Sequence, residues 1–186
     1  MAPPGMEEMS SQLQSLFQDG PSFGCLIGGT PAGTREAGER ISQACGVPVV
    51  LNVVAILDEL DRLGAQRIAV GAPYYSPALN SLLLDFLQQG GYRIEAFQTF
   101  VEQGLFPDQA SVAARRYQFS EDEVLTSLGR TRAAAPGAEA MVVLGTGIRT
   151  ARWLDRLEQA VGLPLVPADS SLYRVAARRL GITSAP

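Results

Sequence analysis

Few residue types in this sequence can do acid–base or nucleophilic chemistry. The chain of 186 residues contains no histidine, and all 15 of its basic residues are arginine. These absences exclude Ser–His–Asp and Cys–His pairs, histidine metal sites, Schiff-base chemistry and Walker-type phosphate loops. Any proton chemistry must therefore come from Cys, Asp, Glu, Tyr or bound water.

Cys25 is the sharpest candidate for a reactive group. It lies at the end of a predicted strand over 22–29 and is followed by a glycine turn and a helix. The N-terminus of a helix stabilises anions and lowers the pKa of a thiol, so Cys25 is suited to be a nucleophile or a proton carrier. The alternative is that it is a small buried hydrophobe, which the neighbouring Leu26 and Ile27 support, and the sequence does not decide between the two. Cys45, at a helix end, fits packing better.

Gly145, Thr146 and Gly147 form a second candidate, a glycine turn between a predicted strand and a helix. The N–H groups of such a turn, with the Thr146 hydroxyl, predict a cradle for an anion. A nucleotide phosphate is the less favoured ligand. Thr150 stands where the dinucleotide-binding pattern needs a third glycine, and Asp169 opens a helix, whereas the acidic residue of that pattern ends a strand. A small carboxylate suits the turn better. A plain tight turn that needs glycine for its geometry is the alternative.

Tyr74 is the third candidate. Together with Tyr75 it follows a predicted strand over 67–73. A tyrosine hydroxyl at a strand end can donate a hydrogen bond to a carboxylate in a cleft. The alternative is that the ring merely packs over the edge of the sheet.

These candidates all depend on predicted strands that alternate with helices. Such alternation is typical of an α/β protein with mostly parallel sheets, whose ligands lie at the carboxyl ends of the strands. We expect strands over 22–29, 47–51, 67–73, 92–100, 140–145 and 163–166. We expect helices over 6–18, 33–45, 53–63, 77–89, 108–117, 120–134, 149–160 and 169–180.

The chain also resembles itself. The motif GVPVV at 46–50 returns as GLPLV at 162–166, each time after a strand, a glycine turn and a helix, and each time before a helix that ends in Leu-Gly. This repeat predicts two α/β lobes that face each other about a pseudo-two-fold axis, with a cleft between them. Cys25 and Gly145 fall at matching positions of the two copies.

Together these motifs resemble the aspartate/glutamate racemase superfamily, in the branch that holds maleate cis-trans isomerase and arylmalonate decarboxylase. The resemblance covers about residues 22–182. CLIGGTPAG at 25–33 is similar to the first cysteine loop of that family, APYYSPALN at 72–80 to its Pro-Tyr…Asn segment, and GTGIRT at 145–150 to its second cysteine loop.

The resemblance implies two pseudo-symmetric lobes, each a parallel sheet flanked by helices, and a reaction without cofactor or metal. Cys25 would then be the catalytic residue. Tyr74, Gly145, Thr146 and Gly147 would bind the carboxylate of the substrate. Because members of the superfamily often pair, the resemblance is compatible with a homodimer.

The sequence departs from the family pattern in three places. Gly145 stands where the second loop has its cysteine, which disfavours racemization because that reaction needs two proton-carrying groups. Leu26 and Ile27 replace a polar Thr-Ser pair that helps to bind the carboxylate. Only a helix precedes the strand of Cys25, so we expect an N-terminally shortened first lobe, formed by residues 1–65 with 167–186, and a second lobe over 66–166.

These observations favour an enzyme that acts on a small carboxylate or dicarboxylate through one cysteine, in the manner of maleate isomerase or arylmalonate decarboxylase. A non-catalytic relative that binds a small carboxylate is the main alternative. The net charge of −4 gives no reason to expect nucleic-acid binding, and no apolar run is long enough to cross a membrane. The N-terminus lacks the pattern of a signal peptide and two cysteines are no disulfide framework, so a cytoplasmic location is expected.

Overall fold

The architecture is a parallel sheet between two layers of helices. The computed structural model describes residues 29–71, 74–116, 118–145, 148, 150–179 and 181. Four strands form one sheet in the order β2-β1-β3-β4, and every neighbouring pair is parallel. Their bounds are Arg67–Gly71 for β1, Arg93–Phe97 for β2, Ala140–Val143 for β3 and Leu165–Pro167 for β4. The predicted α/β class with a parallel sheet is confirmed.

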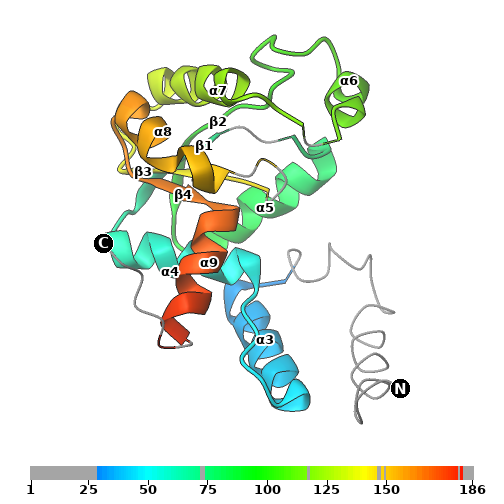
Figure 1. The fold of residues 1–186 in the computed structure, drawn as a ribbon, viewed down its shortest axis with the longest axis vertical. Coiled ribbons are helices and arrows are strands. Elements are labelled where there is room, and N and C mark those ends of the chain that lie inside the picture. Colours follow the sequence, from blue (N-terminus) through cyan, green and yellow to red (C-terminus); the bar gives the residue numbers. More distant parts are fainter. Residues whose placement is uncertain are drawn as a thin grey trace.

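Helices cover both faces of this sheet (Figure 1). One face is buried under α4 (Asn52–Leu63) and α5 (Pro77–Gln89), and the other under α7 (Glu121–Ala134) and α8 (Leu154–Val161). Since successive strand residues point to opposite faces, the central strands β1 and β3 supply both cores, and all of their residues except Arg67 are buried. The last helix, α9 (Ala168–Arg179), packs against α4.

Capping residues mark the ends of several helices. The Ser76 hydroxyl caps α5, and Ser120 forms a capping box with Glu123 at the start of α7. Gly46 ends α3 (Pro31–Cys45) and Gly64 ends α4, both with positive φ. The short helix α6 (Gln109–Ala114) precedes α7, and the predicted helix 149–160 begins as a 3-10 turn, η2 (Thr150–Trp153), before α8. In the described part of the chain, no helix is long and apolar enough to cross a bilayer.

The strand predicted at 47–51 is wrong. Residues 48–51 have no regular secondary structure, and side chains from two helices satisfy the backbone there. The N–H of Val49 donates to the Ser42 hydroxyl over 2.8 Å, and its carbonyl accepts from the Arg179 guanidinium over 3.0 Å. Because these partners replace the hydrogen bonds of a neighbouring strand, the short apolar run of this segment does not produce a strand.

The division into two lobes stays a prediction. The strand expected at 22–29 lies almost entirely outside the described residues, and those that are described contain a single sheet. The expected first lobe of 1–65 with 167–186 contributes α4 and α9, which pack together but also bury one face of the sheet of the expected second lobe, 66–166. The shortened N-terminus of the first lobe also stays a prediction.

Candidate functional site

The order of the strands places the topological switch point of the sheet at the carboxyl ends of β1 and β3. From β1 the chain passes through α5 to β2 on one side, and it then returns through α7 to β3 on the other side of β1. The connections that leave β1 and β3 therefore turn toward opposite faces of the sheet, because α5 covers one face and α8 the other. Parallel sheets bind their ligands where the connections diverge in this way.

Two of the predicted site residues meet at this point. Tyr74 follows β1 and Gly145 follows β3, and both are buried. A Cβ atom added to Gly145 would lie 2.3 Å from the Tyr74 hydroxyl oxygen and 2.5 Å from its Cζ atom. The phenol of Tyr74 therefore lies against the α-carbon of Gly145. Gly145 also has a φ of 90°, a conformation that residues with a Cβ rarely adopt.

The ring of Tyr74 is held in place by other aromatic rings. It stacks on Phe119 with ring centroids 5.9 Å apart and meets Tyr75 at 4.6 Å. Its backbone carbonyl accepts a hydrogen bond from the Gln109 side chain over 2.9 Å. Because the ring is only 7% exposed, packing fixes its orientation and brings the hydroxyl to the start of the loop after β3.

Asp169 is a residue of this edge that the sequence reading missed. It lies in the first turn of α9, directly after β4, and is 5% exposed. Its carboxylate accepts hydrogen bonds from the Thr150 hydroxyl over 2.6 Å, the Ala151 N–H over 3.1 Å and the Ser170 N–H over 2.8 Å. An aspartate at the start of a helix after a buried strand is the sequence pattern that indicates such a role, but by itself it predicts only the start of the helix.

The other predicted site residues, Cys25, Thr146 and Gly147, lie outside the described residues. The structure therefore brings together Tyr74 and Gly145 and leaves the arrangement of the other three a prediction. The described chain begins four residues after Cys25, close to the start of α3 at Pro31.

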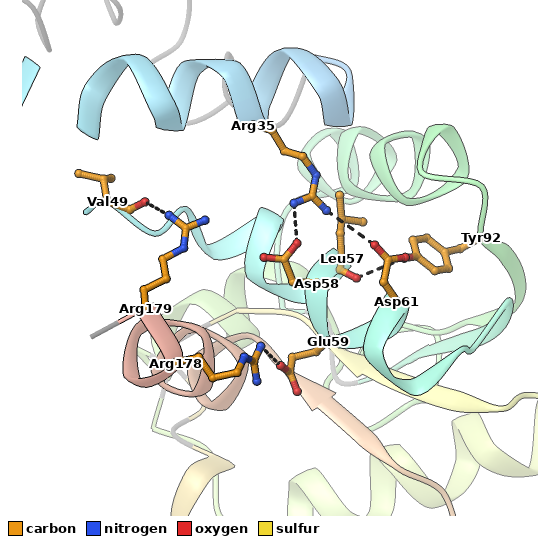
Figure 2. Close-up of polar contacts among 9 residues, drawn as sticks. All are labelled: Arg35, Val49, Leu57, Asp58, Glu59, Asp61, Tyr92, Arg178 and Arg179. Atoms are coloured by element: carbon orange, nitrogen blue, oxygen red, sulfur yellow. Dashed lines mark hydrogen bonds and ion pairs between the residues drawn. The ribbon is translucent and has the colours of Figure 1, made fainter. Parts of the chain in front are cut away.

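An ion-pair network joins α3 to α4 (Figure 2). The guanidinium of Arg35 contacts the Asp58 carboxylate at 2.5 Å and the Asp61 carboxylate at 3.8 Å. Tyr92 donates its hydroxyl to Asp61 over 2.5 Å and to the Leu57 carbonyl over 3.3 Å. Burial and then the hydrogen bond to Asp61 raise the pKa of Tyr92, so the phenol stays protonated and keeps donating. The helix that follows the Cys25 segment is thus attached to α4 through Asp58 and Asp61.

A second network joins α4 to α9 through Glu59, whose side chain is fully buried. Arg178 contacts it at 2.5 Å (Figure 2). Arg62 contacts it at 3.1 Å and Arg174 at 3.7 Å. Burial acts to raise the pKa of Glu59, but the hydrogen bonds from Arg178 and Arg62 outweigh it and lower the pKa below its usual value. Glu59 therefore stays charged and fixes the last turn of α9, while Asp169 fixes the first.

Comparison with known proteins agrees with this architecture. The sequence profile of the arylmalonate decarboxylase family matches residues 30–185. Arylmalonate decarboxylase itself superposes with a TM-score of 0.70 at 20% identity, covering 82% of this chain and 63% of that one. The maleate isomerase of Pseudomonas putida S16 gives a TM-score of 0.67 at 17% identity, covering 80% and 58%.

A further structure is a maleate cis-trans isomerase mutant of Nocardia farcinica with a covalently bound succinylcysteine intermediate. It gives a TM-score of 0.66 at 14% identity, covering 84% of this chain and 62% of that one. The chain thus spans about three fifths of the length of these solved relatives, and no curated protein sequence matches it. The family match covers most of the sequence, so the chain belongs to the arylmalonate decarboxylase family.

Proposed function

We propose that this protein is a cofactor-independent enzyme that acts on a small carboxylate or dicarboxylate through a single cysteine, Cys25. The reaction is either decarboxylation of the arylmalonate type or cis-trans isomerization of the maleate type. Tyr74, Gly145, Thr146 and Gly147 bind the carboxylate of the substrate.

The observation that carries this proposal is the contact between Tyr74 and Gly145 at the carboxyl ends of β1 and β3. It supports a carboxylate site because a phenol lies against Gly145 at the carboxyl ends of parallel strands, where sheets of this kind bind their ligands. The family match adds that relatives with this fold include a decarboxylase and isomerases of small dicarboxylates.

In a decarboxylation, the carbon–carbon bond to the departing carboxylate breaks and carbon dioxide leaves. The electron pair stays on the substrate as an enediolate, whose negative charge the N–H groups of Thr146 and Gly147 and the Tyr74 hydroxyl stabilise. The Cys25 thiol gives its proton to the α-carbon, and the resulting thiolate regains a proton from water. One proton-carrying group suffices for these reaction steps.

In an isomerization, the Cys25 thiolate adds to one carbon of the double bond, and the electron pair moves to the other carbon and its carboxylate as an enediolate. The carbon–carbon bond is now single and rotates, and the electron pair then expels the thiolate and restores the double bond in the trans form. The succinylcysteine intermediate of the Nocardia farcinica enzyme corresponds to such an adduct with a proton added at the second carbon. Racemization is disfavoured, because Gly145 leaves no second thiol in the opposite loop.

The test compares the two cysteines of the chain, which provide a matched pair. Phenylmalonate and maleate are incubated with the wild type, Cys25→Ala and Cys45→Ala, and proton NMR follows the formation of phenylacetate and fumarate. We expect Cys25→Ala to abolish turnover and Cys45→Ala to retain it, since both variants lose one thiol but only one loses the proposed catalytic group. Turnover by Cys25→Ala equal to that of the wild type would refute the role of Cys25.

A non-catalytic relative that binds a small carboxylate is the second candidate. It is favoured by the apolar Leu26 and Ile27 after Cys25 and by the glycine at position 145. The rate of iodoacetamide labelling against pH separates the two candidates. An activated Cys25 reacts well below pH 8, whereas a buried structural thiol barely reacts at any pH used.

A further inference from the structure

We propose that a depression at the amino end of β4 binds a small oxyanion of the phosphate type. The depression has a volume of about 430 Å³ and lies where β4 begins, whereas Tyr74 and Gly145 lie at the carboxyl ends of the parallel strands. This second site uses none of the residues of the candidate active site and so goes beyond the proposed function. Its lining includes residues from the end of α4, from α8, from the turn before β4 and from α9, namely Arg62, Leu63, Glu158, Leu163, Pro164 and Arg174.

Two arginine side chains of this depression approach the same carboxylate oxygen. Arg62 donates from its Nε atom to Oε2 of the buried Glu59 over 3.1 Å, and Arg174 approaches that oxygen to 3.7 Å. Arg178 contacts the other oxygen, Oε1, at 2.5 Å. One negative charge is therefore shared by three guanidinium groups, which repel one another at this short range. An anion that binds beside Arg62 and Arg174 relieves the repulsion.

The acidic residues of the neighbouring helices do not supply this anion. Asp58 and Asp61 of α4 pair with Arg35 of α3. Glu158 of α8 lines the depression, but its Oε1 atom accepts the Leu165 N–H over 2.8 Å, and among the described residues it forms no ion pair with an arginine. Glu158 therefore offsets only part of the positive charge, and the rest faces the solvent.

Both arginines have donors left for a ligand. Arg62 uses its Nε atom for Glu59, and Arg174 makes no hydrogen bond to any residue that the structure describes. Their side chains are 51% and 38% exposed, so an anion can reach them from solution. The planar guanidinium group matches the oxygens of a phosphate with paired donors, and two such groups beside one depression favour a ligand with several oxygens.

Four variants of the full chain test the site. Arg174→Gln removes one of the two cations and leaves the hydrogen bonds of Glu59 with its other two arginines in place, so the fold is expected to persist. Arg174→Lys keeps the charge but loses the planar group. Glu158→Gln removes the acidic charge of the depression, while its amide oxygen can still accept the same backbone hydrogen bond. Arg156→Gln is the control, because Arg156 is an exposed arginine of α8 that pairs with a carboxylate of α7 at 3.1 Å.

The measurement is a titration with inorganic phosphate at neutral pH, with chloride replaced so that the ionic strength stays constant. NMR signals of the arginine Nε–H groups report the binding. In the wild type we expect the signals of Arg62 and Arg174 to follow one saturating curve and that of Arg156 to stay in place. Affinity should fall about tenfold or more in Arg174→Gln, as for the loss of a hydrogen bond from a charged group, and by less in Arg174→Lys. It should rise in Glu158→Gln and stay unchanged in Arg156→Gln.

Three results would overturn the site. The first is a response of Arg62 and Arg174 that grows in proportion to phosphate without saturating. The second is an Arg174→Gln variant that binds phosphate as tightly as the wild type. The third is an equal loss of affinity in Arg156→Gln, since phosphate then responds to the net charge of the chain.

Urea unfolding provides a readout that does not depend on NMR signals. A ligand that binds the folded chain raises its free energy of unfolding, so phosphate should stabilise the wild type more than Arg174→Gln. Phosphate also stabilises proteins generally because it is excluded from their surfaces. Equal stabilisation of the two chains would show that general effect alone and count against the site.

Discussion

Replacing Gly145 with alanine tests the central contact of the candidate site. The added Cβ atom would lie 2.3 Å from the Tyr74 hydroxyl oxygen and 2.6 Å from its Cε1 atom, distances that real Cβ atoms do not show. Tyr74 cannot move aside easily, because its ring is stacked on Phe119 and buried. The substitution must therefore shift the ring, the backbone or both.

The cost has two parts that can be worked out separately. A residue with a Cβ at a φ of 90° costs roughly 1–3 kcal/mol in backbone strain. Overpacking of a filled core costs about 1–3 kcal/mol more. We therefore expect Gly145→Ala to lower the free energy of unfolding by about 2–6 kcal/mol, which is a large part of the roughly 5–15 kcal/mol of a typical domain.

Gly91 is the matched control for the backbone part. Its φ is 92°, almost the same as that of Gly145, but a Cβ atom added there would have no neighbour within 4 Å. Urea unfolding followed by circular dichroism should show that Gly91→Ala costs only about 1–3 kcal/mol, the strain alone. The difference between the two variants measures the collision with Tyr74.

A double-mutant cycle with Tyr74 identifies the cause of that difference. In a Tyr74→Ala background, Gly145→Ala should cost no more than Gly91→Ala, because the ring is gone. Tyr74→Phe should not relieve the cost, since ring carbon atoms remain within 2.6 Å of the added Cβ. A Gly145→Ala variant as stable as Gly91→Ala in the presence of Tyr74 would refute the contact.

Three further predictions concern the elements that support the site. Ser120→Ala should lower the free energy of unfolding in urea by about 1 kcal/mol, because α7 loses its N-cap. Tyr92→Phe should cost roughly 0.5–1.5 kcal/mol in the same assay, since the hydroxyl that donates to Asp61 and to the Leu57 carbonyl is lost while water can reach the exposed Asp61 carboxylate. Hydrogen bonds from the backbone N–H and side chain of Arg67 lower the pKa of Glu139 to about 2. The charged form therefore stabilises the fold above the usual pKa of 4.5 and this contribution is lost as pH falls toward 2, so acid unfolding of Glu139→Gln should depend less steeply on pH between these values.

Local chemistry explains why much of the fold could be predicted from the sequence. The bounds of α5 follow from Ser76 as its cap and the glycine pair after Gln89, and α7 follows from the capping box at Ser120. The error at 47–51 has a non-local cause. The short apolar run around Val49 is typical of a buried strand, but the backbone partners of Val49 come from Ser42 and, 130 positions away, from Arg179.

The sequence predicts where Tyr74 and Gly145 lie in the fold but not which atoms they contact. The positions of Tyr74 and Gly145 after strands indicated that both lie at one edge of the sheet, which is confirmed. That the ring presses on the glycine depends on the packing of Phe119, and no local pattern reveals it. The contacts of Asp169 were not predictable for a related reason. Its partner Thr150 belongs to another helix, and the two residues come together because β4 pairs with β3 in the sheet.

The packing of Tyr74 on Gly145 also bears on how this sequence can evolve. A glycine codon can become a cysteine codon by a point mutation, so a single nucleotide change can place a cysteine at position 145. The Cβ atom of that cysteine would nevertheless meet the phenol ring, and the side chain would be accepted only after Tyr74 or its aromatic neighbours had changed. The order of substitutions is thereby constrained, and a chain with this arrangement does not accept a cysteine at position 145 in a single step.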